Sequence, residues 1–403
     1  MIYAIPDLEP IDRQVIDLIN EQRLMLRHDV NQNPVRWTGF LRRNTLARAI
    51  QGSNSIEGIN ANLAEAVAIV DDERPQTLDE ETRKALSCYR NAMTYVIRSH
   101  EDPHLEISPQ FIRSLHFMML NYDMTRLPGQ WRTGQIFVVR EETDERVYEG
   151  PDAELVPGLM TELVEQIHNG AGAGVGAGTG IDPTVRGAMA HLNLTMIHPF
   201  KDGNGRMARA IQTLVMARDG ILSPVFCSIE EWLGRNTQAY YDKLAEVGQG
   251  QWNPGHSALP WVRFCLVAHY QQAATLIRRN QEVGRIWEAV DRLRREFSIP
   301  DRSQLTLMDA AYGYRVTNVS YRADQEPPIS DVVASRDLRR LCDVGLLEAV
   351  GEKRGRFYKA TQRLVDLRAS LRSPRRVANP YDLVADRTTR GGLSALLAGR
   401  GVV

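Results

Sequence analysis

The segment from His198 to Arg209 reads HPFKDGNGRMAR and gathers several groups that could do chemistry. His198 is the one side chain in it that can act as a base near neutral pH. Asp202 supplies a hard oxygen of the kind that binds Mg²⁺ on phosphates. Arg206 and Arg209 are three residues apart, so on a helix they share a face and can both reach a polyphosphate. A base, a cation ligand and a charge clamp are the groups that phosphoryl-type transfer requires.

The same segment predicts the local structure that would position these groups. Pro199 must end the helix that precedes His198, and a second helix is expected to begin near Gly205. Gly203, Asn204 and Gly205 let the backbone turn so that several N–H groups point one way. The N-terminus of the second helix adds its partial positive charge. We therefore expect a helix, a tight polar loop and a second helix that together form an anion site.

Helical periodicity dominates most of the chain, which predicts a mainly α protein. Apolar residues recur at helical spacing in the segments 11–26, 37–50, 81–97, 108–118, 152–168, 182–198, 230–244 and 261–297. Residues 127–151 break this pattern, because two short β-prone runs flank a charged tip, and a hairpin or flap is predicted there. The Gly/Ala stretch 170–180 lacks the preceding strand and the following lysine of a phosphate cradle, so we expect a surface loop.

The segment 198–209 resembles the motif of the Fic (Fic/Doc) family, HPFx(D/E)GN(G/K)RxxR, and every specified position matches. The resemblance extends from roughly Trp37 to Leu244 and includes the flap. It implies a protein adenylyltransferase, an enzyme that transfers AMP from ATP to a Ser, Thr or Tyr hydroxyl of a target protein and releases pyrophosphate. Gly205 favours AMP transfer, because family members that act as kinases carry Lys at this position and lack the preceding Asp-Gly.

The resemblance also implies a role for each residue of the motif. His198 would deprotonate the target hydroxyl, which then attacks the α-phosphate. Asp202 would hold Mg²⁺ on the α- and β-phosphates of ATP, and Phe200 would point inward and fix the loop. Gly203, Asn204 and Gly205 would form the anion hole. Arg206 would contact the β-phosphate, and Arg209 would contact the γ-phosphate.

Further nucleotide contacts are expected in the segment EEWLGRNTQAYYDKL. Similar proteins contact adenine or ribose near Asn236 and the pair Tyr240 and Tyr241, although aromatic packing on a helix explains the tyrosines equally well. His191 is interpreted as a packing residue and not as a second base. Thr195 departs from the family pattern, in which an acidic residue commonly stands before Ile-His-Pro-Phe, so the details of the nucleotide pocket are open.

An inhibitory segment is predicted at SNSIEG, residues 53–58. Ser53 and Glu57 are four residues apart, so both are expected on one face of a short helix that ends at Gly58. In the Fic family an (S/T)xxxE(G/N) motif marks an inhibitory helix, whose glutamate pairs with the last arginine of the motif and takes the place of the γ-phosphate. The resemblance therefore predicts an ion pair between Glu57 and Arg209 and autoinhibition within the chain. The alternative is an ordinary glutamate on a helix surface.

From about residue 300 the chain is similar to a winged helix. Residues 329–342 would end in the recognition-type helix, and GLLEAV and RFYKA would form the wing strands around a basic turn. Winged helices bind DNA or dock proteins. The basic residues that could contact a phosphate backbone are Arg336, Arg339, Arg340, Lys353, Arg354 and Arg356. Neighbouring acidic residues dilute this charge, so a solvated face or a protein interface is preferred to DNA binding.

The composition limits the class of protein. A length of 403 residues predicts two or three domains, and 43% hydrophobic with 25% charged residues is ordinary for a soluble protein. Lys plus Arg number 49 against 50 for Asp plus Glu, which excludes a globally basic nucleic-acid coat. The four cysteines form no CxxC pair, the N-terminus lacks a secretory signal, and no run approaches the length of a membrane span. A cytoplasmic location is therefore expected.

Five segments follow from these patterns: an N-terminal helical region with the inhibitory motif (1–105), a Fic catalytic core (106–250), a helical connector (251–299), a winged helix-turn-helix domain (300–372) and a poorly ordered tail (373–403). Two other functions stay open. The same site could remove AMP from a modified protein or use another nucleotide, because a glutamate can position water instead of blocking ATP. A DNA-binding regulator with a nucleotide-sensing core is the non-enzymatic alternative, against which the complete catalytic set argues. Dimerisation, self-modification and the identity of the target are also open.

Overall fold

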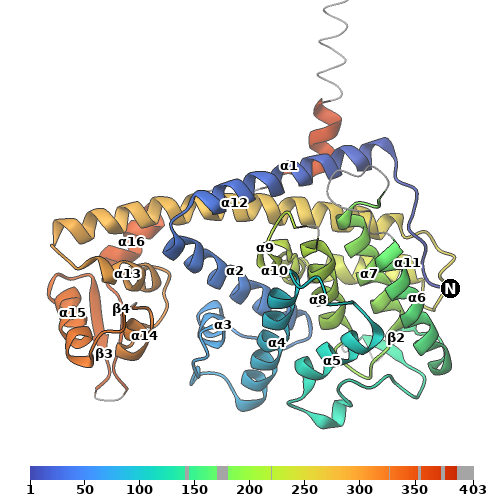
Figure 1. The fold of residues 1–403 in the computed structure, drawn as a ribbon, viewed down its shortest axis with the longest axis horizontal. Helices are drawn as coiled ribbons and strands as arrows, with labels where there is room; N and C mark the ends of the chain where they lie inside the picture. Colours follow the sequence, from blue (N-terminus) through green and yellow to red (C-terminus); the bar gives the residue numbers. More distant parts are fainter. Residues whose placement is uncertain are drawn as a thin grey trace, which may run out of the picture. The chain divides into compact units, whose positions relative to one another are not determined.

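The computed structural model describes residues 1–140, 145–169, 180–218, 220–325, 327–352, 355–373 and 377–387. In these residues the protein is mainly helical, as predicted, with two separate antiparallel pairs of strands (Figure 1). Nearly all of the predicted Gly/Ala loop lies outside the described residues. None of the helices in this part of the chain combines the length and the apolar composition that crossing a membrane requires.

The chain forms two compact units. Unit 1 contains Met1–Arg27, Thr45–Thr275 and Val377–Val403, and unit 2 contains His28–Asn44 and Leu276–Arg376. These bounds differ from the predicted segments, because three helices contribute residues to both units: α1 (Pro10–Gln32), α2 (Val35–Ile56) and α12 (Leu259–Glu296). The predicted connector is therefore not a separate segment, since most of it is the single helix α12.

The other elements of unit 1 follow in chain order. They are α3 (Leu63–Val70), α4 (Glu80–Ser99), α5 (Pro109–Leu120), η1 (Met124–Arg126), β1 (Phe137–Arg140), β2 (Glu145–Glu149), η2 (Ala153–Leu155), α6 (Val156–Asn169), α7 (Pro183–Ile197), α8 (Asn204–Ala217), α9 (Pro224–Cys227), α10 (Glu230–Arg235) and α11 (Thr237–Gly248). The helices predicted around 108–118, 182–198 and 230–244 are all present. The last of these is divided into α10 and α11 at Asn236.

Helices α7 and α8 lie side by side in unit 1 and are buried along nearly their whole length (Figure 1). Asp182 caps α7 by accepting a hydrogen bond from the Thr184 N–H, and Pro183 occupies the first turn, as predicted. Helices α4, α5 and α9 pack against α8, and α6 packs against α7. Phe200 belongs to the same apolar cluster as Ile197, so the loop between α7 and α8, residues 198–203, is anchored in the core.

The predicted hairpin is formed by β1 and β2, which pair antiparallel with an irregular register between Val138 and Val139. The charged tip lies outside the described residues. Glu149 at the end of β2 accepts from the Trp252 N–H at 2.8 Å and donates its own N–H to the Gly250 carbonyl at 3.0 Å. These backbone bonds tie the base of the hairpin to the segment that follows α11.

Unit 2 contains the predicted helices and wing strands: η3 (Asp301–Ser303), α13 (Gln304–Ala311), α14 (Asn318–Ala323), α15 (Asp331–Asp343), β3 (Leu347–Val350), β4 (Phe357–Ala360) and α16 (Gln362–Ser370). Ser330 caps α15, and β3 pairs antiparallel with β4. Of the predicted phosphate-contacting residues, Lys353 and Arg354 lie outside the described residues. The Arg340 guanidinium donates to the Phe297 carbonyl at 2.9 Å and is therefore partly used within unit 2.

The predicted short helix at residues 53–58 is wrong in its extent, because α2 continues without a break from Val35 to Ile56. The weak helix formers Ser53 and Asn54 are fully buried there. The Asn54 side chain donates to the Ile50 carbonyl at 2.8 Å, one turn earlier in the helix. Burial and these hydrogen bonds outweigh the low helix propensity that suggested a boundary.

The predicted poorly ordered tail is also wrong for residues 377–387. Residues 380–387 are helical. The Tyr381 hydroxyl donates to the buried Asp12 carboxylate at 2.8 Å, and Val384 packs in the apolar core of unit 1. The prediction missed Tyr381 and Val384, which lie one helical turn apart in an otherwise polar sequence and attach this segment to unit 1.

Candidate active site

His198 stands directly after α7 in a left-handed backbone conformation, with φ 51° and ψ 58°. Its N–H donates to the Leu194 carbonyl at 3.0 Å, which ends the helix. On the side chain, Nδ1 lies 3.1 Å from the carbonyl oxygen of Thr195. A carbonyl can only accept a hydrogen bond, so Nδ1 carries the proton and Nε2 keeps its lone pair. His198 therefore presents a basic nitrogen.

The surroundings of His198 favour the neutral imidazole. Burial lowers its pKa below the ordinary value, and the hydrogen bond to Thr195 opposes this effect. The positive charge of Arg132 lowers the pKa further, whereas the negative charges of Glu57 and Asp202 raise it. The pKa stays lowered, so the ring is available as a base at neutral pH.

Three side chains fix the α7–α8 loop. Asn204 donates from Nδ2 to the Phe200 carbonyl and accepts on Oδ1 from the Phe200 N–H, both at 2.9 Å. Phe200 points inward, as predicted, and stacks on the His116 ring with 3.6 Å between the ring centroids. His116 accepts on Nδ1 from the Gly129 N–H at 2.8 Å, so its Nε2 donates to the Asp202 carbonyl at 2.9 Å. Burial lowers the pKa of His116 to about 4, which keeps it neutral in this structural role.

Gly203 precedes α8 and requires glycine for two reasons. Its φ of 77° lies in the left-handed region. A Cβ at this position would also lie 2.7 Å from Cδ1 of Leu120.

We expect Gly203→Ala to lower the free energy of unfolding by about 1–3 kcal/mol, because the new methyl group meets both backbone strain and Leu120. Thermal and denaturant unfolding would measure it. Gly158→Ala is the matched control, since nothing lies within 4 Å of a Cβ in that helical position. The control should gain roughly 0.5–1 kcal/mol. Equal effects of the two substitutions would contradict the geometry described for the loop.

Arg206 and Arg209 extend from α8 and are each 1% exposed. Arg206 contacts Asp202 Oδ2 from Nη2 at 3.4 Å, whereas its Nε and Nη1 have no hydrogen-bond partner among the described residues. Nη1 of Arg209 also has none in this part of the chain. Buried N–H groups of a cation are costly to leave unpaired, and an anion would satisfy them. The two side chains therefore offer unpaired donors beside the N-terminus of α8, where an anion site is predicted.

The structure contains the predicted ion pair between Glu57 and Arg209. Arg209 Nη2 lies 2.7 Å from Glu57 Oε1. The same guanidinium donates from Nη2 to the Ser53 carbonyl at 2.9 Å and from Nε to the Ser53 hydroxyl at 2.8 Å. Gly58 follows with a positive φ of 75° and turns the chain away. Residues 53–58, the predicted inhibitory segment, are thus held against α8 through Arg209.

A buried hydrogen-bonded chain continues behind Ser53, which the sequence did not predict. The Ser53 hydroxyl donates to Tyr89 Oη at 2.8 Å, and Tyr89 donates to Glu230 Oε1 at 2.9 Å. Glu230 is 1% exposed, and burial raises its pKa to about 7. These residues come from α2, α4 and α10, so three helices support the position of Arg209.

Gly205 leaves the space that Glu57 occupies. A Cβ on Gly205 would lie 2.5 Å from Glu57 Oε1 and 3.0 Å from Arg209 Nη1. Any larger residue would therefore have to displace the ion pair.

Asp202 is a single carboxylate at the start of α8. Its Oδ1 accepts from the Gly203 N–H at 2.6 Å, and its Oδ2 forms an ion pair with Arg126 Nη1. Burial alone would raise the pKa of Asp202, but Arg206 and Arg126 lower it, so the carboxylate is ionised. No group of three or more His, Cys, Asp or Glu side chains that could hold a metal ion exists among the described residues.

Two arginines at this site were missed in the sequence. Arg126 in η1 pairs with Asp202, and Arg132, shortly before β1, donates from Nε to the His198 carbonyl at 2.8 Å. Both lie in the turn-rich stretch before the hairpin. A run of turn residues beside a family motif is the only signal that could have drawn attention to them.

The predicted nucleotide-contacting residues beyond the motif differ in their surroundings. Tyr240 is 1% exposed and packs near His191 and Trp261, which favours the packing alternative. Asn236 donates from Nδ2 to the Trp232 carbonyl at 2.8 Å. Tyr241 is 45% exposed, and its hydroxyl donates to the carbonyl of Ile56 at the end of α2. Of the two tyrosines, Tyr241 has the ring more open to a ligand.

His191 is fully buried, as its interpretation as a packing residue requires. Its Nδ1 lies 2.6 Å from Gln212 Oε1, and its Nε2 lies 3.1 Å from the Tyr240 hydroxyl. Burial lowers its pKa to about 3, so it stays neutral.

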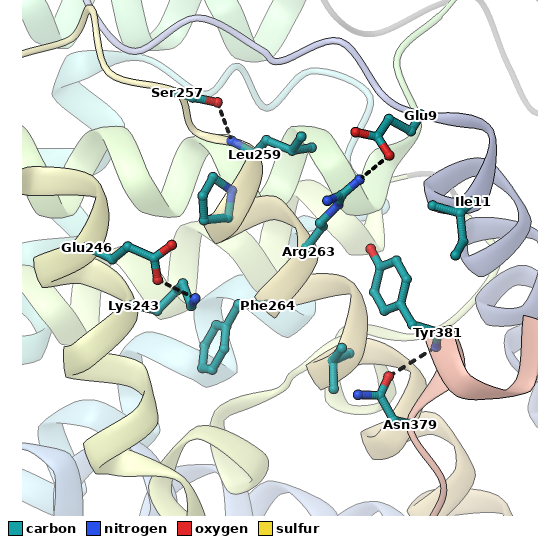
Figure 2. Close-up of a pocket in the computed structure, with 12 residues that line it drawn as sticks. Glu9, Ile11, Lys243, Glu246, Ser257, Leu259, Arg263, Phe264, Asn379 and Tyr381 are labelled. Carbon is teal, nitrogen blue, oxygen red and sulfur yellow. Dashed lines mark hydrogen bonds and ion pairs between the residues drawn. The ribbon is translucent and has the colours of Figure 1, made fainter. Parts of the chain in front are cut away.

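A surface pocket of about 820 Å³ opens elsewhere in unit 1 (Figure 2). Residues around the start of α1, from α11 and α12, and from the segment 377–387 line it. Its charged side chains pair with one another: Arg263 contacts Glu9 at 2.9 Å, and Lys243 contacts Glu246 at 2.5 Å. None of the lining residues belongs to 198–209 or 53–58, so this pocket is distinct from the candidate active site.

The profile of the Fic/DOC family matches residues 106–216 of the chain. Protein adenylyltransferase fic-1 of Caenorhabditis elegans is 32% identical over 152 residues, which cover 38% of this chain and 26% of that protein. Protein adenylyltransferase Fic of Nematostella vectensis is 24% identical over 259 residues, which cover 62% of this chain and 54% of that protein. The chain thus matches between a quarter and about half of the length of these curated relatives.

Solved structures have the same fold. A Fic family protein from Desulfovibrio desulfuricans G20 superposes with a TM-score of 0.55 at 22% identity, over 89% of this chain and 98% of that chain. Residues 134–508 of C. elegans Fic-1 superpose with a TM-score of 0.51 at 24% identity, over 66% of this chain and 72% of that chain. The family profile spans the α7–α8 loop with His198 and Asp202 and the positions of both arginines in α8. The chain therefore contains a Fic/DOC family domain in residues 106–216.

Proposed function

We propose that the protein is an adenylyltransferase, which transfers AMP from ATP to a hydroxyl group of a protein. The observation that carries the proposal is that His198, whose Nε2 is a free base, shares one loop and helix with two buried arginines, each of which keeps at least one nitrogen without a partner in the described part of the chain. A base beside an anion site is the arrangement that phosphoryl-type transfer to a hydroxyl needs. The names of the curated relatives support the same activity.

The reaction can be written through the residues of the chain. His198 Nε2 accepts the proton of the target hydroxyl as its oxygen attacks the α-phosphorus of ATP. The new O–P bond forms while the bond from the α-phosphorus to the bridging oxygen breaks, and pyrophosphate leaves. The N-terminus of α8 and Arg206 stabilise the negative charge on the phosphates, and Arg209 binds the γ-phosphate. The proton on His198 then passes to solvent.

Asp202 fits a Mg²⁺ ion that is bound mainly by the nucleotide. Proteins commonly hold Mg²⁺ through one or two carboxylates together with substrate phosphates, and Asp202 is one ionised carboxylate beside the anion site. When bound, the ion would neutralise charge on the α- and β-phosphates. Arg126 forms an ion pair with Oδ2 of the Asp202 carboxylate, so we propose that Arg126 and the cation compete for Asp202.

We expect Arg126→Met to lower by about two- to fivefold the Mn²⁺ concentration that half-saturates the protein in the presence of a non-hydrolysable ATP analogue. The reason is that the loss of a partly exposed ion pair, about 1 kcal/mol at most, frees Asp202. Electron paramagnetic resonance of free Mn²⁺ measures the binding directly. Arg126→Lys, which keeps the charge, should bind Mn²⁺ as the parent does. Weaker Mn²⁺ binding by Arg126→Met would contradict the competition.

Autoinhibition by Glu57 is proposed on the same geometry. Glu57 neutralises the Arg209 guanidinium at 2.7 Å and lies over Gly205, where the phosphates would pass. A carboxylate and a γ-phosphate cannot occupy this position together. ATP would therefore bind in a productive position only after Glu57 has left.

The flap and unit 2 are the proposed contacts with other molecules. Val138 and Phe137 are half-buried and Val139 is 41% exposed, so β1 offers side chains and a strand edge to an extended segment of a target protein. In unit 2 the order of α13, α14, α15, β3 and β4 supports a winged helix. We propose that it docks a protein, because the exposed arginines of α15 lie between the exposed acidic residues Asp331 and Asp343.

Labelled nucleotides test the proposed activity. The Glu57→Gly protein would be incubated with ATP carrying ³²P on either the α- or the γ-phosphate, with and without a cell lysate. Label from the α-position alone would support AMP transfer, and label from the γ-position would indicate a kinase. No label from either, with ATP bound, would count against transfer from ATP and in favour of AMP removal or another nucleotide.

A further inference from the structure

Arg132 is a buried arginine whose side chain binds only backbone carbonyls. It is 6% exposed. Its guanidinium donates from Nη1 to Gly134 at 2.8 Å and from Nη2 to Pro151 at 2.5 Å and Ile197 at 3.4 Å. From Nε it donates to His198 at 2.8 Å. No carboxylate in the described part of the chain forms an ion pair with it, although the negative charges of Asp152 and Glu154 favour its charged form.

The carbonyl partners of Arg132 come from two parts of unit 1. Gly134 and Pro151 flank the hairpin of β1 and β2, whereas Ile197 and His198 end α7 and begin the α7–α8 loop. The Arg132 main chain adds a further link, because its N–H donates to the Pro199 carbonyl at 2.9 Å. The Arg132 side chain thus joins the start and end of the hairpin to His198, the residue proposed as the general base.

We propose that Arg132 is a positioning residue, which sets the orientation of His198 against the flap. The expected effect on the rate of AMP transfer rests on the proposed function. The hydrogen bonds from Arg132 to the backbone carbonyls do not depend on that function. A guanidinium is planar and carries five N–H donors, so it can serve several carbonyls in different directions at once. A lysine ammonium carries the same charge on a single atom and cannot span these carbonyls.

The charge of Arg132 acts on His198 separately from its hydrogen bonds. Burial is the main cause of the lowered pKa of His198, and Arg132 contributes to it. The other charged groups that face the ring are Glu57 at the end of α2 and Asp202 in the loop, and both raise the pKa. Removal of the Arg132 charge would therefore raise the pKa of His198, and it would do so in the Glu57→Gly background as well, where Asp202 is the remaining carboxylate that faces the ring. More of the base would then be protonated at any given pH.

Two substitutions separate the hydrogen bonds from the charge, both made in the Glu57→Gly background. Arg132→Lys keeps the charge, so the pKa of His198 should stay in place while the rate constant of AMP transfer falls about 10- to 100-fold through misplacement of the base. Arg132→Gln loses the charge, so the pKa of His198 should rise and the acid limb of the pH–rate profile should move to higher pH with it. Binding of a fluorescent ATP analogue should change less than twofold in either variant, because Arg132 contacts no proposed phosphate ligand.

The pKa of His198 would be measured by NMR titration of the imidazole protons in the nucleotide-free protein, which reports on Arg132 even if the protein transfers no AMP. Arg113→Gln is the matched control, since Arg113 also donates to a backbone carbonyl, that of Gly129, but is exposed and does not touch residues 197–199. An unchanged His198 pKa in Arg132→Gln would overturn the charge effect. An AMP-transfer rate constant of Arg132→Lys equal to that of the parent would overturn the positioning role. If Arg132→Gln does not fold, the Arg132→Lys variant alone serves as the test. Absence of transfer by the Glu57→Gly parent itself would reject the proposed function and not this inference.

Discussion

Replacement of His198 by alanine in the Glu57→Gly background is expected to lower the rate of AMP transfer by about 10²- to 10⁴-fold, the usual contribution of a positioned general base. Nε2 of His198 is the free nitrogen of a ring whose Nδ1–H is donated to the Thr195 carbonyl. No other neutral base is positioned in the loop, because His116 uses both ring nitrogens to hold Gly129 and Asp202. Transfer from α-labelled ATP under single-turnover conditions measures the loss.

Two controls make the result for His198 specific. ATP binding should be retained, since the proposed phosphate contacts come from Arg206, Arg209 and the start of α8. His104→Ala, an exposed histidine outside the site, should transfer AMP as the parent does. A His198→Ala protein that transfers AMP at more than a tenth of the parental rate would remove His198 from the role of base.

The rate of the Glu57→Gly parent should also depend on pH in a definite direction. Burial lowers the pKa of His198, so Nε2 is already free of a proton at neutral pH. The rate should stay level above neutral pH and fall as the pH drops through the lowered pKa, because a protonated Nε2 cannot accept the hydroxyl proton. A rate that increases towards acid would mean that the neutral imidazole is not the active form.

The second large effect is expected from Glu57→Gly, which should raise ATP affinity and the transfer rate by about 10- to 100-fold. A charge-assisted hydrogen bond such as that from Arg209 Nη2 to Glu57 Oε1 contributes about 1.5–3 kcal/mol, and an incoming γ-phosphate must replace it. Isothermal calorimetry of ATP binding and α-label transfer measure the two effects separately. Glu57→Gln should lie between the parent and the Gly variant, because it keeps the shape of the side chain and loses its charge.

The AMP-removal alternative makes the opposite prediction for Glu57. A glutamate that orients water would be needed for hydrolysis, so the parent would release AMP from a modified protein faster than Glu57→Gly does. Equal transfer rates for parent and Glu57→Gly, with equal ATP affinity, would show that Glu57 does not restrain the site. Similar thermal unfolding of the parent and of Glu57→Gly would show that neither result comes from a loss of structure.

The parts of the site that could be predicted from sequence share one property: they are close along the chain. The proposed base, the carboxylate, the glycines and both arginines fall within residues 198–209, so helix geometry and a family motif predict that they lie together. Glu57 and Arg209 are 152 residues apart, and their pairing was predicted only because the inhibitory segment has a family pattern of its own.

The rest depends on packing that spacing does not reveal. Arg126 meets Asp202 across 76 residues, and Arg132 meets His198 across 66. Tyr89 and Glu230 are 141 residues apart and come together only because α4 and α10 both pack around the end of α2. The continuity of α2 through Ser53 was missed for the same reason, because burial overrode a local sequence that favours a break.

Because residue 205 is a glycine without a side chain, it links the proposed phosphate site to the ion pair between Glu57 and Arg209, two features that mutation could otherwise change independently. A mutant that acquires any side chain at Gly205 alters the floor of the phosphate site, and the same atoms push Glu57 away from Arg209. A side chain at residue 205 would therefore affect the proposed phosphate site and the proposed restraint together. Among descendants of this sequence, we therefore expect residue 205 and residue 57 to change together.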